Sequence, residues 1–276
     1  MIILRLALLS LAAILALVLG ANLLFEADLA HRADQSPAVA AFQKSNETPT
    51  ADQVRAAREK IEARLASAAP NYMRFFTRLK QVLPHEYDVI LDSFAKQSLE
   101  GADMTNVDSL LSEAVRALRL SRGAMAAKAD GPTLSRIFDM QLAMMRALAA
   151  KNPQLCVDFL YGGASQAFFE FSAENRALVA NMAIAGLNAI DDGRAKKIER
   201  APPSDKDFEL LENALKQKGL DETEIGAILD GKKPTPPISN LRMCQIGQLY
   251  LETLATLPEP TRFRIYALAV ELMTRS

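Results

Sequence analysis

The chain has 276 residues, of which 50% are apolar and 24% are charged, so it can bury a core and does not have the composition of a disordered protein. Its 32 Lys and Arg residues nearly balance its 33 Asp and Glu residues, which gives a formal net charge of −1. No overall positive field exists to attract nucleic acid, so no nucleic-acid partner is expected. The lack of Trp and the low aromatic content of 6% disfavour β-sandwiches, barrels and sugar-stacking clefts.

The first 25 residues have the pattern of an export or membrane signal. Arg5 is followed by residues 6–25, which carry no charge. At about 1.5 Å per residue this stretch spans roughly 30 Å, enough to cross a hydrocarbon core, whereas cleaved signal peptides have apolar cores of about 7–15 residues. The length favours a membrane anchor. A cleaved signal peptide is the alternative, because Leu19-Gly20-Ala21 offers an imperfect small-residue cleavage site.

The charges that flank the apolar run predict its orientation. Arg5 lies on one side, and Glu26 and Asp28 lie on the other, so the positive-inside rule places residues 26–276 outside the cytoplasm. The expected location is therefore membrane-anchored and extracytoplasmic, which means periplasmic in a bacterium. If the signal is cleaved, the remainder is secreted.

Beyond the signal, the sequence predicts a tether and one all-α domain. Residues 26–50 are polar and contain Pro37 and Pro49, which break any long helix. Residues 51–276 are rich in helix-forming residues with apolar positions three and four apart, and they predict a multi-helical globular domain of about ten helices. No alternating strand pattern is present. The pair Pro202-Pro203 marks a possible subdomain break near residues 201–204.

Several helix ends can be assigned from local signals. Thr50 with Gln53 predicts a capping box, and Ser204 with Asp207 predicts another. Gly123 is expected to end a helix in the left-handed conformation.

The most apolar helical stretch is predicted to be the central helix of the domain. We expect Ser172 to cap this helix, which continues to Ile190. Its many small residues would let a neighbouring helix approach closely.

Few side chains suit catalysis. His31 falls in the tether and His85 has no partner at triad or metal-ligand spacing, so both fit an exposed role. Ser93 and Lys96 match the Ser-x-x-Lys pattern of some acyl-transfer enzymes, but the companion motifs are missing. Glu170 lies between aromatic residues, the surroundings expected of a general acid, yet an exposed helical Glu has the same sequence context. No catalytic residue is assigned.

No metal or cofactor is predicted. Asp191-Asp192-Gly193 is better explained as an acidic helix end than as part of a calcium loop, because the other ligand positions are missing. No Gly-rich phosphate loop is present. The spacing of Met140, Met144 and Met145 fits core packing better than an adaptable face for a lipid or a partner helix.

The two cysteines, Cys156 and Cys244, are predicted to form an intramolecular disulfide. Export would place both thiols in an oxidising compartment, and two cysteines in one chain allow one internal pairing. Each lies in an apolar helical pattern, so both are expected to face the core. The alternative is a pair of buried, reduced thiols.

The sequence favours a binding role over catalysis. The leading hypothesis is a protein-interaction or scaffold module of the cell envelope, which contacts a partner protein through an apolar helix face or through a loop at Gly162 and Gly163. A protein that binds a lipid or small molecule between its helices is the first alternative. A hydrolase that acts on an envelope substrate is the second. The membrane is the other expected partner, through residues 6–25.

Overall fold

The computed structural model describes residues 49–161 and 165–274, and within them it confirms the all-α fold. Twelve α-helices and one 3-10 helix, and no strand, occur in these ranges. The helices are α1 (Ala51–Ala68), α2 (Pro70–Val82), α3 (Pro84–Leu99), α4 (Val107–Arg122), the 3-10 helix η3 (Gly123–Lys128), α5 (Gly131–Lys151), α6 (Pro153–Leu160), α7 (Gln166–Glu174), α8 (Arg176–Lys196), α9 (Asp205–Gln217), α10 (Glu222–Asp230), α11 (Asn240–Thr256) and α12 (Glu259–Met273).

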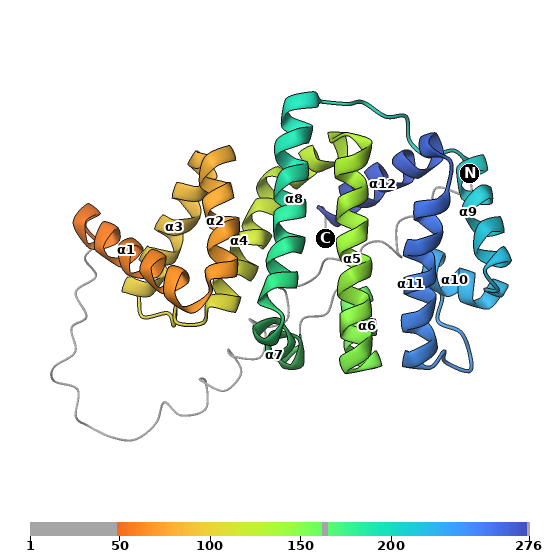
Figure 1. Cartoon of the computed structure of the whole chain (residues 1–276), viewed down its shortest axis with the longest axis horizontal. Coiled ribbons are helices and arrows are strands. Elements are labelled where there is room, and N and C mark those ends of the chain that lie inside the picture. Colours follow the sequence, from red (N-terminus) through yellow and green to blue (C-terminus); the bar gives the residue numbers. More distant parts are fainter. Residues whose placement is uncertain (1–48, 162–164, 275–276) are drawn as a thin grey trace, which may run out of the picture.

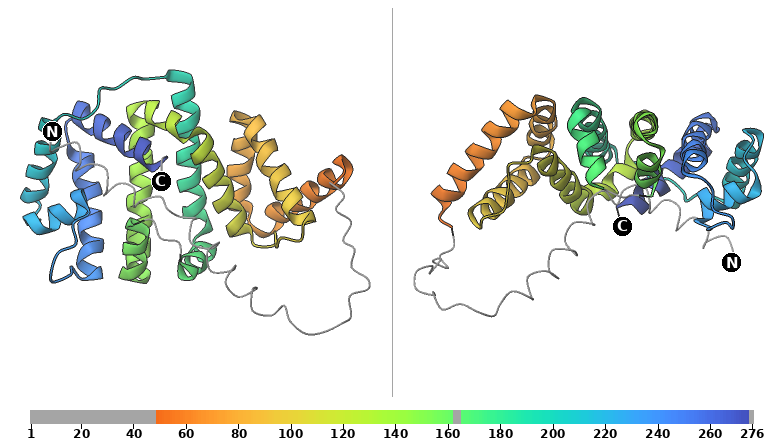
Figure 2. Two further views of the ribbon diagram at one scale, coloured as in Figure 1. Left: turned by 180° about the vertical axis from the view of Figure 1, so that it is seen from behind. Right: turned by 90° about the horizontal axis from the view of Figure 1, so that it is seen from below.

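The helices form a row in which neighbours pack side by side (Figure 1). Helix α8 packs between α2 and α5, and α5 packs against α11 on its other side. Helices α1 and α3 extend the row beyond α2, and α9 extends it beyond α11 (Figure 2). Helix η3 crosses the row, where it packs against α8, α12 and α4. The buried apolar side chains form one continuous cluster from α1 to α12.

Gly193 of α8 allows a close approach to η3, at a position beyond the helix end that the sequence predicts. A Cβ added to Gly193 would lie 1.9 Å from the backbone oxygen of Met125 in η3, a distance that no larger residue could accept. Helix α8 also contacts α2, α5, α4 and α7, so it occupies a central position in the row.

Both predicted capping boxes are confirmed. The Thr50 hydroxyl accepts a hydrogen bond from the Gln53 backbone N–H, and the Gln53 side chain accepts one from the Thr50 N–H. Ser204 and Asp207 are paired in the same way at the start of α9. The first boundary fixes where the helical domain begins.

The helix end predicted at Asp191-Asp192-Gly193 is wrong, because α8 continues to Lys196. Two further predicted boundaries, at Ser172 and Gly123, are also wrong. Ser172 does not cap the central helix; it lies inside the unexpected helix α7, where its hydroxyl donates to the Phe168 carbonyl, and α8 begins at Arg176. Gly123 is right-handed, with φ −55°, and α4 continues directly into η3. A Cβ at Gly123 would lie 2.6 Å from Thr274 Cγ2, so the glycine lets the residue that follows α12 approach closely.

The disulfide between Cys156 and Cys244 is present. It joins α6 to α11 across a Cα–Cα distance of 5.7 Å and a sequence separation of 88 residues. Both cysteines are almost fully buried, at 0% and 1% exposure. The bridge therefore ties two helices of the core to each other, as their apolar patterns predict.

Residues 197–204 connect α8 to α9 without helical structure. This segment is held to η3, because the Arg200 guanidinium donates to the carbonyl oxygens of Ala127 and Ala129. Whether the chain divides into subdomains near residues 201–204 stays a prediction.

The expected anchor (residues 1–25) and nearly all of the expected tether (residues 26–50) lie outside the described residues. Within the described ranges, no helix combines the length and apolarity needed to cross a membrane.

Two carboxylates join distant helices by ionic hydrogen bonds. Asp130, at the start of α5, accepts from Lys196 Nζ of α8 at 2.5 Å and from the Thr133 N–H at 2.8 Å, which lowers the pKa of Asp130 to about 2. Asp207 accepts from Arg264 of α12, which holds the pKa of Asp207 well below its ordinary range.

These lowered pKa values predict loss of stability in acid. A carboxylate with a lowered folded-state pKa stabilises the fold above its unfolded pKa of about 3.9, and this stabilisation is lost as the pH falls through the folded-state value. We expect the urea midpoint to be constant above about pH 5 and to fall between about pH 4 and pH 2. Asp130→Asn with Asp207→Asn should start lower at neutral pH and fall less steeply. An unchanged acid slope in this double variant would contradict the assignment.

Candidate ligand-binding cavity

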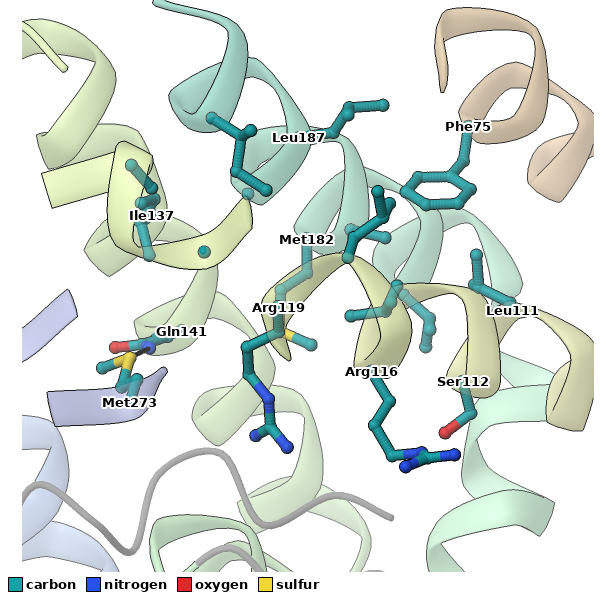
Figure 3. A pocket seen from close by; sticks show the side chains of 18 of the residues that line it. Phe75, Leu111, Ser112, Arg116, Arg119, Ile137, Gln141, Met182, Leu187 and Met273 are labelled. Carbon is teal, nitrogen blue, oxygen red and sulfur yellow. Dashed lines mark hydrogen bonds between the residues drawn. The ribbon is translucent and has the colours of Figure 1, made fainter. Parts of the chain in front are cut away.

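A cavity of about 180 Å³ lies within the helical row and is partly open to solvent (Figure 3). Side chains from α2, α4, α5, α8 and α12 contribute to its wall. The wall is almost entirely apolar, with Phe75, Leu111, Ile137, Met182, Leu187 and Met273 among its residues. Such a wall gives an apolar molecule a place to leave water.

Gly186 keeps part of this space open. It lies in the middle of α8 and lines the cavity, and a Cβ added there would have no atom within 4 Å. A glycine in a helix interior costs about 1 kcal/mol relative to alanine. Gly193 of the same helix is required by its contact with η3, but no close contact requires Gly186. An alanine or a larger residue at position 186 would reduce the volume of the cavity.

Two arginines of α4 also line the cavity. Arg119 is only 7% exposed, and Arg116, three residues earlier, has a side chain that is 35% exposed. Burial, and then the like charge of Arg116, lower the pKa of Arg119. Arg116 pairs with Glu113 on its own helix, with Nη2 and Oε2 2.7 Å apart. The apolar cavity therefore has positive charge in its wall.

Gln141 of α5 supplies a buried amide to the same wall. Its side-chain Nε2 donates to the thioether sulfur of Met273 at 3.7 Å, and a thioether is a weak acceptor. Its Oε1 atom is buried without a hydrogen-bond partner in the described structure, and the residue is only 2% exposed. An amide that the protein satisfies so poorly is available to a ligand.

The buried carboxylate beside the cavity is fully engaged by the protein. Asp108 accepts from Tyr72 Oη at 2.5 Å and from Arg176 Nη2 at 2.8 Å and Nε at 3.1 Å. Burial, and then the hydrogen bond to Asp108, raise the pKa of Tyr72. This network joins α2, α4 and α8, so its role is structural rather than that of a free general base.

The catalytic candidates from the sequence do not meet at this cavity. Ser93 and Lys96 are both exposed on α3, and the Ser93 hydroxyl accepts from Gln97 Nε2 at 3.1 Å. Glu170 is exposed on α7, on the side away from its buried neighbour Phe168, and His85 is exposed at the start of α3. None of these side chains lines the cavity.

The remaining candidate residues from the sequence lie either outside the described residues or in the core. Gly162 and Gly163, the possible interaction loop, and His31 lie outside the described residues. Met140, Met144 and Met145 are buried, at 9%, 0% and 1% exposure. Two other methionines, Met182 and Met273, line the cavity instead.

Sequence reasoning missed the cavity residues for a physical reason. Gly186 has the ordinary context of a small residue in an apolar helix, and Arg119 has that of a surface arginine next to Leu118. One signal was available: Gln141 occupies an apolar position between Phe138 and Met145 in the helical pattern of α5.

No group of three or more His, Cys, Asp or Glu side chains within residues 49–161 and 165–274 is placed to hold a metal ion.

Comparisons of the chain with protein-family models, with curated proteins and with solved structures found no match.

Proposed function

We propose that the protein binds a small, predominantly apolar molecule in the cavity between its helices. The observation that carries the proposal is the apolar cavity of about 180 Å³, with Gly186 facing open space. An apolar cavity of about 150 Å³ is large enough to bind a benzene-sized molecule. The ligand is therefore about the size of one ring or a six-carbon chain, and a whole lipid does not fit inside.

The scaffold hypothesis has less support than ligand binding. Of the large apolar side chains that are exposed in the described structure, two lie ten residues apart on α3 and the others belong to different helices or a helix end. Singly exposed apolar residues are ordinary in folded proteins. They are Val89, Leu99, Leu120, Tyr161, Leu210 and Leu241. A partner protein of the cell envelope stays a prediction. Hydrolase activity has no supporting arrangement of side chains at the cavity.

We also propose that the domain acts outside the cytoplasm. The buried disulfide supports this location, because structural disulfides persist mainly in oxidising compartments. The apolar run at residues 6–25 supports delivery across a membrane.

Filling the cavity is expected to abolish ligand binding. Gly186→Leu places a Cβ where no atom lies within 4 Å and directs the rest of the side chain into the cavity volume, so the fold should tolerate it while the binding space shrinks. Ala177→Leu adds an apolar side chain at an exposed position of the same helix and serves as the matched control. Gly186→Ala should raise the free energy of unfolding by about 0.5–1 kcal/mol.

Binding can be followed by the methyl NMR signals of methionine in the full chain, titrated with 1-hexanol and with toluene. We expect shifts at Met182 and Met273, which line the cavity, and none at the core residue Met144. The shifts should persist in Ala177→Leu and disappear in Gly186→Leu. Absence of shifts in the unaltered protein, or equal shifts in Gly186→Leu, would refute the proposal.

A further inference from the structure

Gln141 is a polar side chain in the otherwise apolar part of the cavity wall that α5 supplies. It lies one helical turn after Ile137, and both residues line the cavity. In Figure 3 its amide lies beside Met273 and apart from Arg116. Only 2% of Gln141 is exposed, so its amide is out of reach of bulk water. The hydrogen bonds of this amide must therefore come from the protein or from a bound molecule.

The two polar atoms of the amide differ in what they lack. Nε2 donates to Met273 Sδ at 3.7 Å. Oε1, which can only accept, has no hydrogen-bond partner in the described structure. An unpaired buried acceptor costs free energy, and a donor supplied by a ligand recovers that cost. The group that Gln141 lacks is therefore a hydrogen-bond donor.

The charges of the wall favour a neutral donor over an ammonium group. A buried cation needs an anion beside it. Asp108 is the one acidic residue in the described wall, and it already accepts from Tyr72 and Arg176. An ionised carboxylate is also unsuitable, because it would place a second acceptor against Oε1. A hydroxyl group is neutral and carries the required O–H donor.

The side chain that contacts the amide is a flexible one. Met273 also lines the cavity, and a methionine side chain has three rotatable bonds. Its thioether is a weak acceptor, so the hydrogen bond from Nε2 costs little to break. Displacement of this side chain opens the amide to the cavity. A hydroxyl group in its place can donate to Oε1 and can accept from Nε2.

Resting on the ligand-binding function proposed above, we propose that the natural occupant is a small neutral alcohol or phenol whose hydroxyl group donates a hydrogen bond to Gln141 Oε1. Its apolar body, of about six carbons, lies against Ile137 and the other apolar side chains of the wall. Gln141 then selects the head group, because a ligand without the hydroxyl leaves Oε1 unpaired.

The test compares phenol with toluene, which has a methyl group in place of the hydroxyl, and with anisole, whose oxygen accepts but does not donate. Binding is followed by the methyl signals of Met182 and Met273 in the full chain. In a wholly apolar cavity toluene would bind more tightly than phenol, because water holds the phenol hydroxyl. We expect phenol to bind at least as tightly as toluene, and anisole to bind no more tightly than toluene.

Gln141→Met separates the hydrogen bond from the cavity, because methionine has a length similar to that of glutamine but no amide. This variant should lower the affinity for phenol about tenfold, which equals about 1.4 kcal/mol, and should leave the affinity for toluene nearly unchanged. Ile137→Met is the matched control. It changes an apolar wall residue one turn away, so it should alter both affinities by the same factor and keep their ratio.

The ratio of the phenol affinity to the toluene affinity decides the inference. A fall of about tenfold in Gln141→Met but not in Ile137→Met supports it. An equal ratio in Gln141→Met and the unaltered protein overturns it, while the ligand-binding function stands. If Gln141→Met does not fold, then weaker binding of phenol than of toluene, or equal binding of phenol and anisole, overturns the inference in the unaltered protein. If none of the three ligands shifts the methyl signals, both proposals fail.

Discussion

Replacement of both cysteines, Cys156→Ala with Cys244→Ala, is expected to lower the free energy of unfolding by about 3 kcal/mol and the Tm by roughly 6–12 °C. The bridge spans 88 residues of sequence, and a cross-link over a loop of this length removes about 4.5 kcal/mol of unfolded-state entropy in the chain-entropy model. Measured effects are usually lower, about 2–4 kcal/mol. The bridge joins α6 to α11, so its loss affects the core itself.

Denaturant unfolding of purified protein measures the effect. The single variants Cys156→Ala and Cys244→Ala also lack the cross-link, so each should lose nearly as much stability as the double variant. Mass analysis without reductant should find no free thiol in protein recovered from outside the cytoplasm. Two free thiols there, or equal stability of the double variant and the unaltered chain, would exclude the stabilising role.

The sequence predicts those parts of the fold that depend on local interactions. A capping box needs two side chains within one helical turn, so Thr50 with Gln53 could be recognised without tertiary information. The disulfide is a long-range contact, but it could be predicted because two cysteines leave one internal pairing.

The wrong assignments of Ser172 and Gly123 depend on contacts that local patterns do not contain. Gly123 is right-handed because α4 continues directly into η3, and Thr274, about 150 residues further along the chain, lies close to it. Ser172 has the side chain of a helix cap, but Phe168 and Phe171 are buried and place it inside α7 instead. In both cases tertiary packing overrides the local preference.

The candidate cavity was beyond prediction for a related reason. A void is a property of how several helices fail to fill the space between them, and no single helical pattern encodes it. Gly186 and Gly193 lie seven residues apart on α8 and look equivalent in sequence, yet one faces open space and the other packs against η3. The helix pattern gives the buried face, but only the tertiary arrangement gives the cavity.

Asp207→Ala is expected to lower the free energy of unfolding by about 3 kcal/mol, because it removes the acceptor at the centre of a buried network. The Asp207 side chain is 3% exposed and accepts from Arg264 Nη2 at 2.6 Å and Nε at 3.0 Å. The Thr261 hydroxyl donates to it at 2.6 Å, and the backbone N–H and the hydroxyl of Ser204 donate at 2.8 Å. Loss of the carboxylate would leave these donors without their acceptor.

The sequence predicts the Ser204 part of this network as a capping box, but not the bond to Arg264, which lies 57 residues away and links α9 to α12. Asp205→Ala is therefore the matched control: Asp205 is exposed in the first turn of the same helix, and its loss should cost no more than about 0.5–1 kcal/mol through the helix dipole. Urea unfolding at neutral pH compares the two variants. If Asp207→Ala loses as little stability as Asp205→Ala, then the network contributes only a helix cap and does not hold α9 to α12.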